Sequence, residues 1–268
     1  MRTIKLTLAY DGTDFAGWQI QPGSRTVQAT LEETIGKITS VRPSTLASGR
    51  TDAGVHALGQ VVSFRTESRL SAEVLQRALN AKLPRSMAVL DAADVHDGFQ
   101  VIRDALRKRY RYVIYNGPIR DIFSLRYAWH YARGQLDADA MQRAAVSLVG
   151  THDFSSFETS GSPRKTSIRT VHDLRIERGR GGQEHLVTLE IEADGFLYNM
   201  VRTIVGTLVD VGRGARPEFW PGEVLKAMDR RRAGQTAPPQ GLFLVNVEYP
   251  GARETEFIPF TRKDKATE

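Results

Sequence analysis

The chain has 268 residues, of which 41% are hydrophobic and 25% charged, so it can bury the core of one large domain or of two smaller ones packed together. It contains no cysteine, which excludes disulfides, thiolate metal sites and a cysteine nucleophile. Its formal net charge of +6 suits a polyanionic partner without identifying one.

The apolar residues form no signal for export or membrane insertion. The first residues, Met1 to Lys5, lack the apolar core of a signal peptide. The longest apolar stretch, residues 200–211, is interrupted by Arg202 and Asp210, and it is therefore not expected to span a membrane. We expect a soluble, cytoplasmic protein.

The first half of the chain predicts strands that alternate with helices. Residues 4–10 alternate apolar and polar side chains, which is typical of a strand, and Asp11-Gly12 ends it. Apolar residues then recur at helical spacing over residues 27–38. The later elements of this half are a strand over 60–64, a helix over 71–80 and a strand over 87–90.

The second half repeats this alternation with different lengths. Aromatic and β-branched residues predict a strand over 109–115, in which Tyr110, Tyr112 and Ile114 share one face. The elements expected after it are a helix over 137–149, a loop over 150–157, strands over 170–177 and 186–192, helices over 196–211 and 223–228, and a strand over 242–247.

A loop rich in functional side chains lies between the first helix and the second strand. Two glycines, Gly49 and Gly54, allow unusual backbone angles around Arg50, Asp52 and His56. An acid and a guanidinium on such a loop are placed to meet a ligand. The alternative is that Asp52 is only a turn residue whose carboxylate bonds to its own backbone.

Cations and aromatic rings alternate over residues 107–112. Cations contact phosphates and rings stack on exposed bases, so this mixture favours a nucleic acid over a membrane. Further basic groups occur at residues 164–165, at Arg213 with Arg216, and at 230–232. For each cluster the alternative is a solvated face, and residues 230–232 would also complement the end of a helix.

Several of these stretches resemble one family, the tRNA pseudouridine synthase A family. The longest match is to its active-site signature, Ser48-Gly49-Arg50-Thr51-Asp52-Ala53-Gly54-Val55-His56-Ala57. Shorter blocks similar to this family occur in its order along the chain, at residues 9–19, 108–112, 152–157, 196–202 and 236–242. The chain departs from the family pattern at Val101-Ile102, where an arginine is usual before the tyrosine strand, and Arg103 stands one residue later.

The resemblance implies isomerisation of uridine to pseudouridine at positions 38, 39 and 40 of the tRNA anticodon stem-loop. Uracil leaves the ribose C1′, turns and bonds again through C5, so the reaction needs no cofactor and no metal. The resemblance also implies a homodimer, because the anticodon arm needs a wide basic surface. It leaves open whether the catalytic aspartate attacks C1′, attacks C6 of the ring or abstracts a ribose proton.

The resemblance assigns roles to five residues. Asp52 is the catalytic nucleophile or base, and Arg202 pairs with it; a nearby guanidinium is expected to lower the pKa of the carboxyl. Tyr110 stacks against the target base and can move a proton. Arg50 fills the gap left by the flipped base or holds the nucleotide. His56 is a structural or RNA-contacting residue. For Arg202 and Tyr110 the alternatives are a structural helix cation and a core tyrosine.

These observations together predict an α+β fold. It has two similar mixed α/β halves whose mainly antiparallel sheets pack side by side, with the active-site cleft between them. The N-terminal half, residues 1–105, carries the aspartate loop. The C-terminal half, residues 106–250, carries the tyrosine strand and the arginine helix, and residues 251–268 form a polar tail.

Two other classes of function remain open from the residues. A non-catalytic RNA-binding module would need the basic and aromatic surface but neither Asp52 nor Arg202. A metal-dependent nuclease or phosphotransferase would need several carboxylates around one ion, and the acids near the signature are too few for that.

Overall fold

The computed structural model describes residues 1–159 and 166–251. The polar tail beyond residue 251 and the basic pair at 164–165 lie outside the described residues. The strands of the described part are β1 (Arg2–Tyr10), β2 (Leu46–Ala47), β3 (His56–Thr66), β4 (Met87–Val95), β5 (Arg107–Tyr115), β6 (Trp129–His130), β7 (Gly150–Asp153), β8 (Ile168–Arg178), β9 (Leu186–Ala193) and β10 (Leu242–Glu248). The α-helices are α1 (Val27–Thr39), α2 (Ala72–Asn80), α3 (Ala138–Ala145), α4 (Met200–Gly212) and α5 (Trp220–Ala227).

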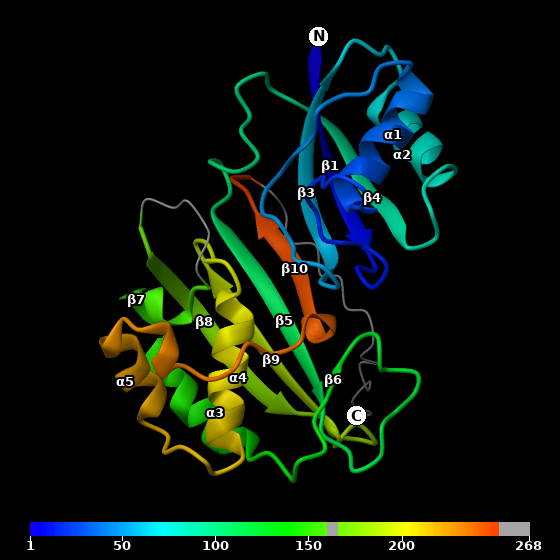
Figure 1. Cartoon of the computed structure of the whole chain (residues 1–268). Coiled ribbons are helices and arrows are strands. Elements are labelled where there is room, and N and C mark those ends of the chain that lie inside the picture. Colours follow the sequence, from blue (N-terminus) through cyan, green and yellow to red (C-terminus); the bar gives the residue numbers. More distant parts are fainter. Residues whose placement is uncertain (160–165, 252–268) are drawn as a thin grey trace, which may run out of the picture.

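The strands form one 10-stranded sheet in the order β4-β1-β3-β10-β5-β9-β8-β7, with β2 paired to β3 and β6 to β5. Helices α1 and α2 lie at its β4–β1 end, and α3, α4 and α5 at its β5–β8 end (Figure 1). Pairing is antiparallel except between β10 and β3 and between β5 and β6. The expected α+β fold with mainly antiparallel strands is confirmed, and the two expected sheets are joined edge to edge into this one sheet.

The last strand joins the two parts of the sheet. β10 runs antiparallel to β5 over most of its length, whereas its contact with β3 is short and pairs Phe243 with His56 and Leu244 with Ala57. β10 therefore lies between the start of β3, which directly follows the aspartate loop, and β5, which carries the tyrosines, and it holds these two strands one strand apart (Figure 1).

Local chemistry explains why most elements form where the sequence predicts. Thr26, Ser71 and Asp137 cap α1, α2 and α3 by accepting hydrogen bonds from backbone amides in the first helical turn. In β5, Tyr110, Tyr112 and Ile114 are buried as a set, as the alternation predicts.

Two stretches differ from the prediction for identifiable reasons. The expected loop over 150–157 contains β7, which pairs with β8, and a 3-10 turn over Ser155–Phe157. The helix expected from residue 196 begins only at Met200, because Asn199 adopts a left-handed backbone with φ of 61° that a helix cannot contain. Residues 196–199 are therefore free to line a cavity.

A close backbone contact fixes α4 against the segment before β10. A Cβ atom on Gly206 would lie 1.8 Å from the carbonyl oxygen of Gln235, so only glycine permits this approach. The amide of Gly234 also donates to the Thr207 hydroxyl over 3.0 Å. The chain around Ala237 is consequently held against the first turns of α4.

Candidate active site

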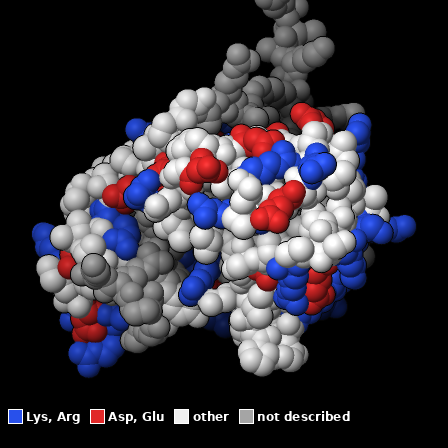
Figure 2. All heavy atoms as spheres, turned by 90° about the horizontal axis from the view of Figure 1, so that it is seen from above, with Lys and Arg blue, Asp and Glu red and all other residues white. Residues whose placement is uncertain are grey.

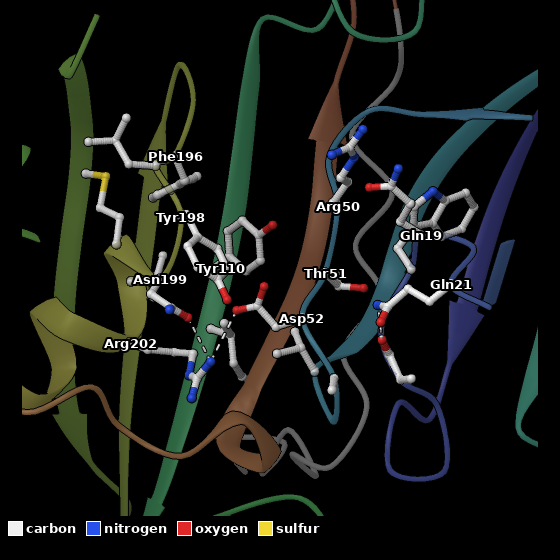
Figure 3. Close-up of a pocket in the computed structure, with 18 residues that line it drawn as sticks. Gln19, Gln21, Arg50, Thr51, Asp52, Tyr110, Phe196, Tyr198, Asn199 and Arg202 are labelled. Carbon is white, nitrogen blue, oxygen red and sulfur yellow. Dashed lines mark hydrogen bonds and ion pairs between the residues drawn. The ribbon is translucent and has the colours of Figure 1, made fainter. Parts of the chain in front are cut away.

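A pocket of about 550 Å³ opens between the two parts of the sheet. Figure 3 shows that its wall combines the loop after β1, the aspartate loop, one tyrosine of β5 and the segment that leads into α4. Asp52, Tyr110, Arg202 and Arg50, which lie far apart in the sequence, all line it. The structure therefore brings together four of the five residues that the sequence analysis singled out.

The aspartate loop is held in place by side chains beneath it. The Tyr10 hydroxyl and the Thr51 hydroxyl share a hydrogen bond of 2.8 Å, and burial raises the pKa of Tyr10 to about 12, so this phenol stays protonated. The Gln60 amide donates to the carbonyl oxygen of Gly49 over 2.7 Å, and Lys108 of β5 donates to that of Ser48. Contacts of the residues that directly precede Asp52 therefore preorganise its backbone.

Asp52 meets Arg202 across the pocket (Figure 3). The Nη1 of Arg202 lies 3.2 Å from Oδ2 of Asp52, and the two side chains are 15% and 27% exposed. Arg202 also donates from Nε to the carbonyl oxygen of Ala237 over 2.7 Å. Within the described residues, Oδ1 of Asp52 has no hydrogen-bond partner. One carboxylate oxygen is thus held while the other faces the cavity.

The pKa of Asp52 differs from the expectation. The sequence analysis predicted a lowered pKa because of Arg202, but the pKa is raised above its ordinary value of 3.8. Burial is the largest effect and raises the pKa of Asp52. The charge and the hydrogen bond of Arg202 both lower this pKa, but by less than burial raises it. The expected effect of the arginine is present, and desolvation outweighs it.

Tyr110 lies on the floor of the pocket with only 8% of its surface exposed. Its ring meets the edge of Phe196, with 5.0 Å between the ring centroids and 82° between the planes. Aromatic pairs favour this edge-to-face arrangement, which fixes the tyrosine ring. A flat apolar surface is therefore held beside the Asp52 carboxylate.

Arg50 lies on the side of Asp52 away from Arg202, and its guanidinium points away from the Asp52–Arg202 pair (Figure 3). Its side chain is exposed, and among the described residues it makes no hydrogen bond or ion pair. A cation in this position is available to an anionic ligand at the mouth of the pocket.

His56 lies outside the pocket and is 1% exposed. Its Nδ1 accepts from the Gly12 amide over 3.0 Å, and its Nε2 lies 2.9 Å from the carbonyl oxygen of Arg126 and 3.2 Å from that of Gln240. Burial lowers the pKa of the imidazole. This geometry favours the structural role for His56 over contact with a substrate.

The alternation of cations and rings over residues 107–112 has a structural explanation. Tyr110 and Tyr112 are buried on one face of β5, whereas Arg109 and Arg111 pair with Glu192 and Glu190 of β9 on the other. The arginines and the rings thus lie on opposite faces, while Lys108 shares the tyrosine face and bonds to Ser48 of the aspartate loop, so the pattern does not form one exposed nucleic-acid surface.

Sequence reasoning assigned no role to several residues that line the pocket. They are chiefly Gln19, Gln21, Phe196, Tyr198 and Asn199. All except Gln21 fall inside the two blocks 9–19 and 196–202 that resemble the family, which is the signal that could have marked them. Tyr198 is 42% exposed, so it offers an aromatic surface at the edge of the cavity.

Other expectations concern features outside this pocket. At the departure from the family pattern, Ile102 is exposed and Arg103 pairs with Asp104 at 3.1 Å; neither lines the pocket. In the described ranges, no helix is both long and apolar enough to cross a membrane. Nor do three or more His, Cys, Asp or Glu side chains of those ranges gather where they could hold a metal ion.

Comparisons with known proteins show the family of the chain. A family model described as tRNA pseudouridine synthase matches residues 7–102 and 144–250. The tRNA pseudouridine synthase A of Thermoanaerobacter sp. (strain X514) is 46% identical over 249 residues, which cover 93% of this chain and 100% of that protein. The tRNA pseudouridine synthase A of Acetivibrio thermocellus is 44% identical over 250 residues, with the same coverage.

Among solved structures, the crystal structure of a Cbf5-Nop10-Gar1 complex matches with a TM-score of 0.35 and 11% identity, over 90% of this chain and 57% of that one. This likeness is too weak to bear on function. The family model and the relatives are decisive, since they cover most of the chain at substantial identity. The chain therefore belongs to the tRNA pseudouridine synthase A family, which is a family of isomerases.

Proposed function

We propose that this enzyme isomerises uridine to pseudouridine at positions 38, 39 and 40 of the tRNA anticodon stem-loop, with Asp52 as its catalytic group. The observation that carries the proposal is the pocket in which Asp52, Arg202 and Tyr110 converge from three segments of the chain. Family membership supports tRNA as the substrate, and the signature around Asp52 supports the anticodon arm.

The size and lining of the pocket suit a flipped nucleotide. A cavity of about 550 Å³ falls in the range of small-molecule sites, which is roughly 300–1,000 Å³. The target base in a stem is stacked and must be turned out of the helix, at a cost of a few kcal/mol. Tyr110 provides a ring for stacking, and the free cation of Arg50 is placed to fill the gap or to hold the flipped nucleotide.

The reaction is redox-neutral and its atoms balance within the nucleotide and water. The bond between N1 of uracil and C1′ breaks, the detached ring turns, and a bond between C5 and C1′ forms. The proton on C5 is then lost to solvent, and N1 gains a proton. Asp52 acts as nucleophile or base through the oxygen that faces the cavity, while Arg202 holds the other oxygen.

The net charge of +6 supports a polyanionic partner, although the basic side chains form no single patch on the face that Figure 2 shows. Seen from above, Lys and Arg side chains lie on both parts of the molecule and are interspersed with Asp and Glu (Figure 2). Several of the basic clusters noted in the sequence are paired internally, for example Arg213 with Asp210 and Arg231 with Asp229. We therefore propose that two subunits together offer the surface for the anticodon arm, as a homodimer in the cytoplasm.

The function is tested with unmodified tRNA that carries tritium at C5 of a uridine at only one of the positions 38, 39 or 40. Formation of the new C5 bond expels that tritium into water. The expected result is release from these substrates and none from a control labelled only in the acceptor stem. Absence of release from every substrate labelled in the anticodon arm would contradict the proposal.

The homodimer is tested separately by sedimentation at the concentration used in the assay. The expected species has twice the chain mass of 29.9 kDa. A single species of the chain mass under conditions of full activity would refute the dimer and leave the proposed reaction unaffected.

A further inference from the structure

Asn199 connects the pocket wall to the helix that carries Arg202. It is one of three non-glycine residues with positive φ among the described residues, and its φ of 61° ends the preceding loop directly before Met200. Asparagine tolerates this left-handed conformation better than most residues. Its side chain points toward Arg202 rather than into solvent (Figure 3).

The amide of Asn199 makes two side-chain contacts with opposite roles. Its Oδ1 accepts a hydrogen bond from Nη1 of Arg202 over 2.8 Å, and its Nδ2 donates to the hydroxyl of Thr159 over 3.1 Å. Because arginine has donors only, the oxygen of the amide must face Arg202. The backbone amide of Thr159 in turn donates to the carbonyl oxygen of Tyr198 over 3.1 Å, so the chain at Thr159 is bonded to the residues directly before α4.

Three groups share the guanidinium of Arg202. Ala237 accepts from Nε at 2.7 Å and Asn199 accepts from Nη1 at 2.8 Å, whereas the same Nη1 reaches Asp52 only at 3.2 Å. The contact with the catalytic carboxylate is thus the longest of the three. Its geometry depends on the two shorter bonds that orient the guanidinium plane.

We propose that Asn199 is a positioning residue that holds Arg202 against one oxygen of Asp52 and leaves the other oxygen free to react. Without the amide, the guanidinium is fixed at Nε alone and rotates away from Asp52. The attraction that opposes the burial of the carboxylate then weakens, and the ionised form of Asp52 becomes rarer at a given pH.

The informative variant is Asn199→Gly, since glycine adopts the left-handed backbone without strain and removes only the amide. Asn199→Ala would add the strain of a left-handed alanine to the loss of the side-chain amide, and the two effects could not be separated. A matched control is Thr159→Val, which removes the hydroxyl partner of the amide but keeps the contact between Asn199 and Arg202. Thr159→Val should change the pKa of Asp52 and the single-turnover rate in the same direction as Asn199→Gly, but by less.

The first measurement needs no tRNA and is independent of the proposed reaction. The carboxyl carbon of Asp52 is followed by ¹³C NMR across a pH titration, with Asp52→Asn used to assign its signal. We expect the pKa of Asp52 to be higher in Asn199→Gly than in the wild type. An unchanged or lower pKa would overturn the proposed positioning role.

The second measurement rests on the proposed function. In single-turnover tritium release, we expect Asn199→Gly to lose roughly tenfold in rate near neutral pH, with tRNA affinity retained and with the acid limb of the pH profile moved to higher pH. An equal loss at every pH, accompanied by a lower melting temperature, would indicate a merely structural role and overturn the proposal. Lack of tritium release by the wild type would refute the proposed function, whereas the NMR titration would still decide the role of Asn199.

Discussion

Asp52 and His56 stand four residues apart in one signature, yet the structure gives them opposite environments. Asp52 opens into a pocket with one free oxygen and an arginine on the other. His56 is enclosed on the far side of the loop, with both ring nitrogens engaged by Gly12, Arg126 and Gln240. Its ring also stacks on Phe243, with 4.7 Å between the centroids.

A residue of this signature can therefore either face the pocket, as Asp52 does, or support the loop from beneath, as His56 does. Burial works against the charged form of both groups, raising the pKa of Asp52 and lowering that of His56. For Asp52 the result is a partly buried carboxylate whose pKa is raised although Arg202 lies beside it, and we propose that this carboxylate is the reactive group. For His56 the consequence is a neutral imidazole that ties the loop to the chain before β10.

The largest effect is expected for Asp52→Asn, which tests the proposed catalytic role of Asp52. Tritium release should fall by about 10³-fold or more, because the amide is neither nucleophile nor base. Binding of tRNA should persist. The raised pKa means that the ionised carboxylate disfavours folding above that pKa, so the variant should melt at an equal or higher temperature at neutral pH. A variant with residual activity close to that of the wild type would contradict the assignment.

Arg202→Met should reduce the single-turnover rate by about a hundredfold, a loss of about 2.7 kcal/mol in transition-state stabilisation. The guanidinium lowers the pKa of Asp52 against the effect of burial. Its removal should therefore shift the acid limb of the pH–rate profile to higher pH. A profile of unchanged shape would show that Arg202 acts only on the fold.

His56→Ala tests the structural role of His56. We expect the free energy of unfolding to fall by about 3 kcal/mol, because the variant leaves a cavity and unsatisfied polar groups around the ring. Well below its melting temperature the variant should release tritium at close to the wild-type rate. Chemical denaturation and single-turnover assays on the same sample check this, and a stable but inactive variant would place His56 in the chemistry instead.

The same histidine gives a pH dependence of stability. Its pKa is lowered in the folded state, so the unfolded chain binds more protons below about pH 6.5 and stability falls as the pH drops from there. The slope of melting temperature against pH between about 6.5 and 5 should be smaller in His56→Ala than in the wild type. Equal slopes would assign the acid sensitivity to other groups.

The smallest effect is expected for Arg50→Ala. If Arg50 holds the flipped nucleotide through a phosphate, its loss should weaken tRNA binding by about tenfold and should reduce the number of salt ions released on binding by about one. Stability should not change, because Arg50 is exposed and makes no ion pair with the described residues. Lys226→Ala, which removes an exposed cation on α5, is the matched control and should retain affinity.

Periodic segments were predictable from the sequence, because burial of one face leaves a repeating pattern. The helix over 27–38 and the buried set Tyr110, Tyr112 and Ile114 in β5 are examples, and both are confirmed. Helix α4 was predicted to begin four residues early, since apolar spacing continues through Asn199 and only the backbone angle interrupts it. The pairing of β10 with β3 is non-local and leaves no pattern in either strand.

The site was predictable in its residues but not in its electrostatics. The signature and the arginine of α4 indicated that Asp52 and Arg202 meet, and the ion pair is present at 3.2 Å. The sign of the pKa shift depends on how much water the folded chain removes, which no spacing encodes. Enclosure likewise separates His56 from Asp52, and it arises from loops more than 60 residues away, at Arg126 and Gln240.

The central claim is that the ionised carboxylate of Asp52 drives the reaction from this pocket. The most direct test compares the acid limb of the single-turnover tritium-release profile with the pKa of Asp52 measured by ¹³C NMR in the same enzyme. We predict that the two midpoints coincide and lie above 3.8, the ordinary value for aspartate. A rate that is unchanged as the Asp52 carboxyl becomes protonated would contradict the claim.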